Sequence, residues 1–234
     1  MTITEVGCMG VKPSLDVIND STTEGQILTK LYKYVVTAPG GPLRVYWGLE
    51  IENPSYLWAL FDWNSIQDHE NFAKTLGQEA AKESPKILTH GLFTEHITAT
   101  QSLPVALQSP ITEVILAYFP SDISSAQKDA AITNLKNSEK DLLIFPDIGA
   151  LSYGWGVESD FPVRDGQENQ RASILMSFIG LDSIDAHTKF RKTPTFEKLL
   201  SLIKNMEKIM KLESLSVSFR SLTRNTEEET IEDM

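Results

Sequence analysis

The chain has 234 residues, 41% of them hydrophobic and 23% charged, and a formal net charge of −11 at pH 7. This length fits one large domain or two of about 100 residues each, and the composition allows a buried core. The negative charge argues against a nucleic-acid partner and against anionic membrane surfaces, because both require clustered Lys and Arg.

The first half reads as strands and helices in alternation. Alternating apolar and polar residues over 2–11 predict a half-buried strand, and helical spacing over 14–36 predicts an amphipathic helix. Two β-rich runs, 43–52 and 55–63, are separated by the turn signal Asn53-Pro54. Asn64 is predicted to cap the next helix, with Gln67 completing a capping box, and 86–99 forms the last strand.

After a linker at 100–110, the second half repeats this order. We predict a strand at 110–119, a helix at 122–140, strands at 148–158 and 170–181, a helix at 183–209 and a strand at 212–222. Asp182 and Asp185 take the cap positions of the second of these helices. The last eleven residues carry five acids against one Arg, which predicts a solvated, disordered tail.

Three short repeats relate the two halves. "ITEV" at 3–6 returns at 111–114 and "WG" at 47–48 returns at 155–156, both offset by 108 residues. "NSIQDHENF" at 64–72 returns as "DSIDAHTKF" at 182–190, offset by 118. The ten additional residues fit in a long hairpin loop at 159–170. Repeats in the same order with consistent offsets indicate a duplicated unit.

The predicted fold class is α+β. Each half has the order β-α-β-β-α-β of a ferredoxin-like domain, whose antiparallel sheet carries both helices on one face. The bare face must be covered, and a second copy in the same chain can cover it. We therefore predict two domains, 1–103 and 104–223, whose sheets pack face to face as an intramolecular dimeric α/β barrel, followed by the tail at 224–234. Whether this pseudo-dimer pairs further is left open.

The motifs "VYWG" and "SIQD" resemble those of the dimeric α/β-barrel superfamily. That group includes stress-responsive A/B-barrel proteins, antibiotic-biosynthesis monooxygenases and olivetolic-acid-cyclase-like proteins, and the chain resembles fungal members with two fused copies. In the cyclases "IQD" precedes a catalytic tyrosine; here that position holds His69, and His187 in the second half. The position of their catalytic histidine is Thr75 in the first half and Thr193 in the second.

His69 and His187 are the candidate catalytic residues. Helical spacing places them on the same face as Phe72 and Phe190, respectively, pointing toward the interface between helix and sheet. The resemblance implies that the ligand cavity lies there. An imidazole with a pKa near ~6.5 can act as general acid or base. The alternative is a buried histidine hydrogen-bonded to backbone.

Aromatic residues supply candidates for the wall of a pocket, and core packing is the alternative for all of them. Because Trp58 and Trp63 occur only in the first half, the two cavities cannot be identical. His90 is favoured over His96 as a cavity residue because His96 is near the end of its strand. The substrate-binding candidates are Tyr46, Trp47, Trp58, Trp63, Phe72, His90, Tyr153, Trp155 and Phe190.

Several classes of site lack support in the sequence. His90 and His96 would lie about 20 Å apart along a strand, too far to share a metal, and we predict no metal site and no cofactor. Motifs for dinucleotide, P-loop, α/β-hydrolase and zincin sites do not occur. No apolar run approaches the ~20 residues that span a bilayer, so a cytoplasmic location is expected.

Two functions remain. The first is a cofactor-independent cyclase, isomerase or monooxygenase acting on a small apolar, aromatic or polyketide-like molecule through His69 or His187. The second is a non-catalytic ligand-binding or stress-response protein. Pocket shape discriminates between them, because an open aromatic-lined cavity with an imidazole at its wall supports chemistry.

Overall fold

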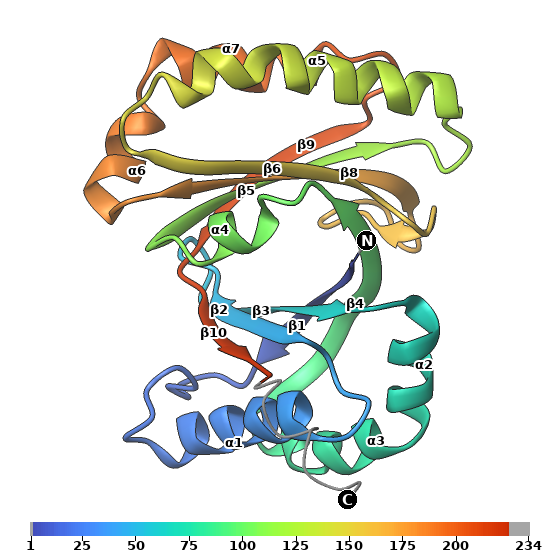
Figure 1. Cartoon of the computed structure of the whole chain (residues 1–234), viewed down its shortest axis with the longest axis vertical. Helices are drawn as coiled ribbons and strands as arrows, with labels where there is room; N and C mark the ends of the chain where they lie inside the picture. Colours follow the sequence, from blue (N-terminus) through green and yellow to red (C-terminus); the bar gives the residue numbers. More distant parts are fainter. Residues whose placement is uncertain (1, 225–234) are drawn as a thin grey trace, which may run out of the picture.

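The computed structural model describes residues 2–224, which form two facing layers of strands with helices on the outer face of each layer and the short helix Leu103–Leu107 between the layers (Figure 1). The first half contains β1 (Ile3–Val11), α1 (Thr23–Thr37), β2 (Arg44–Leu49), β3 (Tyr56–Trp63), α2 (Ile66–Lys74), α3 (Leu76–Ala80), the 3-10 helix η1 (Ala81–Lys86) and β4 (Leu88–Ala99). The helix α4 (Leu103–Leu107) follows. The second half contains β5 (Ile111–Phe119), α5 (Ser125–Leu143), β6 (Ile148–Gly156), β7 (Phe161–Pro162), β8 (Arg171–Leu181), α6 (Ile184–Phe190), α7 (Pro194–Lys204), β9 (Lys211–Val217) and β10 (Arg220–Thr223).

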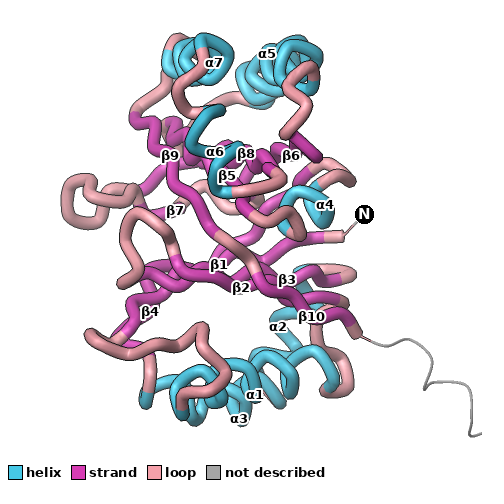
Figure 2. Tube along the Cα trace, turned by 90° about the vertical axis from the view of Figure 1, so that its left-hand side faces the viewer, coloured by secondary structure: helices cyan, strands magenta, loops and turns pink. Residues whose placement is uncertain are grey.

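The strand order is the same in the two halves. It is β2-β3-β1-β4 in the first and β6-β8-β5-β9 in the second, and neighbouring strands are antiparallel. β4 pairs with β6, which joins the two halves into one continuous sheet. Figure 2 shows α5 and α7 at one end of the molecule and α1 and α3 at the other, with the strands between them. This arrangement confirms the α+β class and is consistent with a ferredoxin-like fold.

Alternation along each strand separates an inner core from two outer ones. On β1, Val6 and Cys8 are fully buried in the core between the two layers of strands. The intervening residues, Glu5, Gly7 and Met9, face the helices of the first half. Separate apolar clusters lie under α1 and under α5 and α7. Consecutive residues of a strand therefore point to opposite faces of the sheet, one into the core between the layers and the next toward the helices. The face on which a candidate residue lies determines what it can contact.

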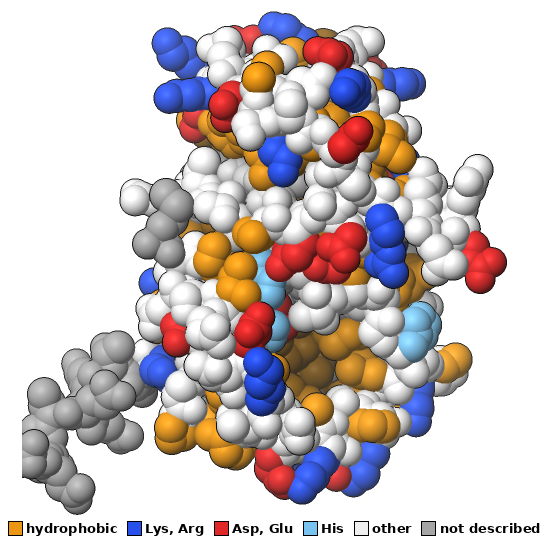
Figure 3. All heavy atoms as spheres, turned by 90° about the vertical axis from the view of Figure 1, so that its right-hand side faces the viewer, with side chains coloured by type: hydrophobic (Ala, Val, Ile, Leu, Met, Phe, Trp, Pro, Cys, Tyr) orange, Lys and Arg blue, Asp and Glu red, His pale blue; other side chains and the backbone are white. Residues whose placement is uncertain are grey.

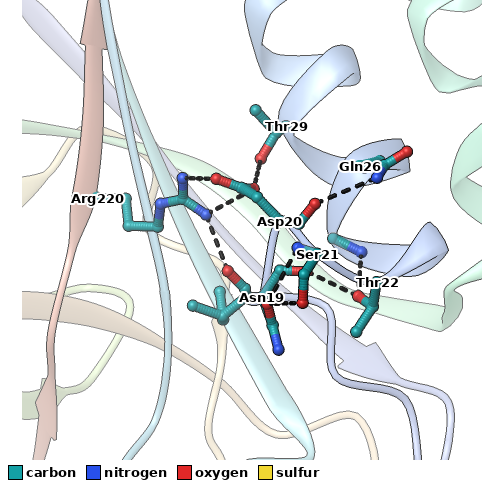
Figure 4. Close-up of polar contacts among 9 residues, drawn as sticks. Asn19, Asp20, Ser21, Thr22, Gln26, Thr29 and Arg220 are labelled. Carbon is teal, nitrogen blue, oxygen red and sulfur yellow. Dashed lines mark hydrogen bonds and ion pairs between the residues drawn. The ribbon is translucent and has the colours of Figure 1, made fainter.

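The end of the chain returns to the first half. β10 pairs with β2, and an isolated bridge joins Glu50 to Val217. Figure 4 shows how Arg220 on β10 reaches the loop before α1, where its guanidinium binds the Asp20 carboxylate and donates to the Ile18 carbonyl at 2.9 Å. The predicted strand at 212–222 is therefore two strands, one in each half.

Helix boundaries differ from the predictions for local reasons. The predicted helix at 14–36 begins only at Thr23, because Thr22 accepts the Gly25 N–H as an N-cap. The caps of α2 and α6 are Ser65 and Ser183, one residue after the predicted ones. A serine hydroxyl at this position accepts the backbone N–H of the residue three positions later, so the aspartate or asparagine before it is not needed.

Two further segments behave differently from their predictions. The predicted helix at 183–209 is broken before Pro194, which opens α7 at a position that proline favours, with Thr193 as its cap. The linker contains α4, whose Leu103 and Leu107 are buried in the core between the sheets. The polar hairpin at 159–170 also enters that core through Phe161.

The tail predicted over 224–234 lies outside the described residues except for Arg224, whose backbone N–H donates to the Leu43 carbonyl at 2.9 Å. Between residues 2 and 224, none of the helices has the length and apolar character needed to traverse a bilayer.

Candidate functional site

A cavity of about 370 Å³ lies in the first half, between the helix-facing side of the sheet and α1, α2, α3 and η1. Its wall is mainly apolar and includes Met9, Leu31, Val35, Phe61 and Phe72. Figure 3 shows a hollow lined with hydrophobic side chains on this side of the molecule, with histidine and acidic side chains at its edge. The size and lining are those of a site for a small organic molecule.

Glu5 places a carboxyl group on the wall of this cavity. The residue is only 8% exposed, and the Trp63 indole N–H donates to its Oε2 at 2.9 Å. Burial raises the pKa of Glu5 to about 7, although the hydrogen bond from Trp63 lowers it. A carboxyl group in this environment exchanges its proton near neutral pH, as a general acid or base requires.

His69 on α2 lies beside Glu5. Its Nε2 is 3.4 Å from the Glu5 Oε2, and its ring centroid is 5.1 Å from that of Trp63. Burial, together with the neighbouring His96, lowers the pKa of His69 to about 4. Between pH 4 and pH 7 the proton therefore resides on Glu5 and the imidazole is neutral, so the contact is a neutral pair and not a salt bridge.

His96 on β4 continues the contacts away from the cavity. Its Nε2 lies 2.8 Å from the His69 Nδ1, and its Nδ1 lies 2.6 Å from the Glu158 Oε1. The His96 backbone N–H also donates to the Glu158 Oε2 at 2.8 Å. Glu158 follows β6 in the second half, and the pairing of β4 with β6 brings it to this position.

The equivalent place in the second half is arranged differently. Glu113 is fully buried, and the His187 Nε2 lies 2.6 Å from its Oε2. The Arg191 guanidinium binds the same carboxylate through two hydrogen bonds of 2.9 and 3.0 Å. Arg191 occupies the position of Ala73, which lines the first-half cavity. A carboxylate held in this way is a structural ion pair with no free face for a ligand.

The structure brings only some of the predicted site residues together. Trp63, His69 and Phe72 line the cavity. Strand alternation places Tyr46 and Trp58 in the core between the sheets, while Trp47 packs against Tyr32 under α1. In the second half Tyr153, Trp155 and Phe190 belong to the core under the helices, and His187 binds Glu113. His90 is exposed and contacts the Thr89 hydroxyl. The functional roles of all these predicted site residues stay predictions.

Two residues of the site, Glu5 and Glu158, were not singled out from the sequence, and a third, His96, was ranked below His90. The repeats contain a signal for two of them, because "ITEV" carries a glutamate in both copies and "WG" is followed two residues later by Glu50 and Glu158. His96 carries no such signal, because its counterpart opposite Glu113 is Ser216. Among residues 2–224, no group of three or more His, Cys, Asp or Glu side chains could hold a metal ion.

Neither a protein-family model nor a curated protein sequence matches the chain. Solved structures do. An anthrone oxidase-like protein is 13% identical with a TM-score of 0.63, and the match covers 95% of this chain and 93% of that one. A candidate monooxygenase from Fusobacterium nucleatum is 14% identical with a TM-score of 0.59, covering 95% and 94%. A chlorite dismutase from Candidatus Nitrospira defluvii is 10% identical with a TM-score of 0.54, covering 94% and 90%. At these identities the likeness shows a shared fold.

Proposed function

We propose that the chain is a cofactor-independent enzyme that removes a proton from a small aromatic molecule bound in the first-half cavity. The observation that carries the proposal is the buried Glu5 carboxyl group, which lies on an apolar wall beside Trp63 and His69. A base with a pKa near the working pH combines a useful ionised fraction with a strong driving force for proton transfer. Glu5, and not His69, is therefore the base, because a pKa of about 4 makes His69 too weak.

The apolar wall selects the kind of substrate. Phe61, Trp63 and Phe72 favour a flat aromatic body, and Glu5 requires an acidic C–H or phenolic O–H next to it. Proton removal from such a molecule gives a carbanion or phenolate whose charge is spread over the rings. That intermediate can cyclise, isomerise or react with dioxygen.

We favour the reaction with dioxygen, and the names of two structural neighbours support this choice: an anthrone oxidase-like protein and a candidate monooxygenase. Anthrone has an acidic CH2 group between two aryl rings. Loss of its proton followed by reaction with one O2 gives the corresponding quinone and one water, which balances without another reductant. A cyclase acting on a polyketide-like substrate is the second form of the same proton-transfer chemistry.

We further propose that the two halves are tandem copies of one ferredoxin-like unit, 1–103 and 104–223, forming an intramolecular pseudo-dimer as in fungal members of the dimeric α/β-barrel group. The repeated "ITEV", "WG" and "SI…H" motifs and the equal strand orders support this. On this proposal one copy keeps an open site, while in the other Arg191 closes it.

Anthrone deuterated at its CH2 group tests the proposal under anaerobic conditions. The wild type should accelerate the washout of deuterium into water, and Glu5→Gln should reduce that rate by about 100-fold, within the range of general acid–base catalysis. Glu113→Gln, the matched change in the second half, should leave the rate within about twofold of wild type.

Oxygen uptake in air then separates the alternatives. Uptake that depends on Glu5 supports a monooxygenase, and washout without uptake supports an isomerase or cyclase. Binding of anthrone without washout would refute the enzyme and leave the non-catalytic ligand-binding protein.

A further inference from the structure

The contacts of His69 and His96 continue from the cavity to the surface of the other half. The links are Glu5 Oε2 to His69 Nε2 at 3.4 Å, His69 Nδ1 to His96 Nε2 at 2.8 Å, and His96 Nδ1 to Glu158 Oε1 at 2.6 Å. The Glu158 side chain is 27% exposed, while that of His96 is 9% exposed. The four side chains therefore connect a buried carboxyl group, that of Glu5, to a partly solvent-exposed one, that of Glu158.

Hydrogen-bond chemistry fixes the direction of each proton in this series. The Glu158 Oε2 accepts the His96 backbone N–H at 2.8 Å, and because a carboxylate is an acceptor only, its Oε1 accepts the hydrogen that His96 carries on Nδ1. With its hydrogen on Nδ1, the His96 ring offers a lone pair on Nε2, and His69 donates to it from Nδ1. The Nε2 of His69 is left as an acceptor facing Glu5.

We infer that Glu5, His69, His96 and Glu158 form a proton relay that carries the proton taken from the substrate across the boundary between the halves to solvent. This inference rests on the proposed function, and it adds His96 and Glu158, which do not line the cavity, as positioning and relay residues.

One transfer moves three protons and no electrons. The Glu5 O–H passes its proton to His69 Nε2, the His69 Nδ1–H passes to His96 Nε2, and the His96 Nδ1–H passes to Glu158. Both imidazoles stay neutral before and after, so no buried positive charge forms, which the low pKa of His69 would oppose. Glu158 releases the proton to water. The first link is the longest, and such contacts commonly shorten when substrate binds.

The second half lacks this series at two points. Ser216 stands opposite Glu113 where His96 stands opposite Glu5, and Arg191 holds Glu113 as a carboxylate. The Ser216 hydroxyl donates to the Glu52 Oε1 at 2.8 Å, so its hydrogen is directed away from Glu113 and His187. The relay is thus specific to the half that has the cavity.

Other charged groups surround the relay and act on the same protons. They are Glu70, which acts on His69, and the group beside Glu158 formed by Glu95, Asp160 and Arg171. At the exit, Asp160 and Glu95 add negative charge next to Glu158, although the pKa of Glu95 is raised to about 7 by burial and by Asp160, and Arg171 opposes them.

Nitrogen-15 NMR of the two imidazoles tests the relay without any substrate. Both rings should carry their hydrogen on Nδ1 and not on Nε2, as their contacts require, whereas a histidine in water prefers hydrogen on Nε2. Either ring found with hydrogen on Nε2 in the wild type would overturn the proton order on which the relay depends.

Deuterium washout from anthrone gives the functional test. In Glu158→Gln and in His96→Gln, the bound anthrone anion should still form, as seen by its absorbance, but washout should fall about 10-fold or more because the deuteron returns to the same carbon. Glu168→Gln, in the exposed hairpin, is the matched control for Glu158→Gln and should change neither quantity. Washout at the wild-type rate in Glu158→Gln would refute the relay.

These outcomes are distinguishable from failure of the proposed function. If anthrone neither binds to the wild type nor loses deuterium, the proposed function fails. The hydrogen positions on His69 and His96, measured by nitrogen-15 NMR, still test the proton order of the relay. If anion formation and washout fall together in Glu158→Gln, that residue supports the shape of the site and the relay is wrong.

Discussion

Glu5 and His69 make opposite contributions to the pH dependence of stability, and single variants should expose them. Burial raises the pKa of Glu5 from 4.5 to about 7, so between these pH values the folded state holds a proton that the unfolded state has lost. Stability from this group therefore falls as pH rises through that window. Burial lowers the pKa of His69 from 6.5 to about 4, so the unfolded state holds the additional proton and stability rises with pH.

The magnitudes follow from the two shifts. At about 1.4 kcal/mol per pKa unit, Glu5 costs about 3 kcal/mol by pH 7. His69 contributes a smaller change of about 1–2 kcal/mol, because its partial contact with solvent screens the charge. In the wild type the two slopes overlap between pH 4.5 and pH 6.5 and cancel in part, so the larger Glu5 contribution leaves a net fall in stability with rising pH.

Glu5→Gln imitates the protonated carboxyl group, since an amide can accept from Trp63 and donate to His69. The free energy of unfolding of this variant, from urea denaturation, should rise by about 1–2 kcal/mol between pH 4.5 and pH 6.5 as the His69 slope is uncovered. It should exceed that of the wild type above pH 7. In His69→Gln the free energy of unfolding should fall as pH rises, because only the Glu5 contribution remains. A Glu5→Gln profile parallel to the wild-type profile would refute a buried carboxyl group with a raised pKa.

Three further changes give distinct results. Ala73→Arg should place a guanidinium beside Glu5, as Arg191 stands beside Glu113, and weaken anthrone binding more than about 10-fold in a fluorescence titration; unaltered binding would mean that the ligand lies elsewhere. Trp63→Phe removes the indole donor that lowers the pKa of Glu5, so the midpoint of the washout rate against pH should move above 7; a downward move would contradict this. Arg220→Gln should speed amide hydrogen exchange in β10, because the contacts with the loop before α1 are lost; equal protection would show that strand pairing alone holds β10.

The elements of the fold were predictable because their signals are local. Alternation along 2–11 and helical spacing over 122–140 correspond to β1 and α5. Boundaries were less accurate wherever a side chain outside the pattern decided them, as Thr22 does for α1 and Pro194 does for α7. The pairing of β10 with the first half could not be predicted, because it depends on contacts between residues about 200 positions apart.

The site was predictable in part for the same reason. Helical spacing pointed His69 toward the sheet, and the structure places it on the cavity wall. Glu5 was missed because an acidic residue on a strand is usually solvated, and only the packing of α1 and α2 over β1 buries it. His96 and Glu158 meet through the pairing of β4 with β6, a contact between the halves that sequence spacing does not encode.

The most direct test of the ligand site uses the four tryptophan indole N–H signals in a two-dimensional NMR spectrum. Only Trp63 lines the cavity, whereas Trp47, Trp58 and Trp155 lie in the three separate cores. Titration with anthrone should shift the Trp63 signal and leave the Trp155 signal in place. A shift of Trp155 without one of Trp63 would place the ligand in the second half and contradict the assignment of the site.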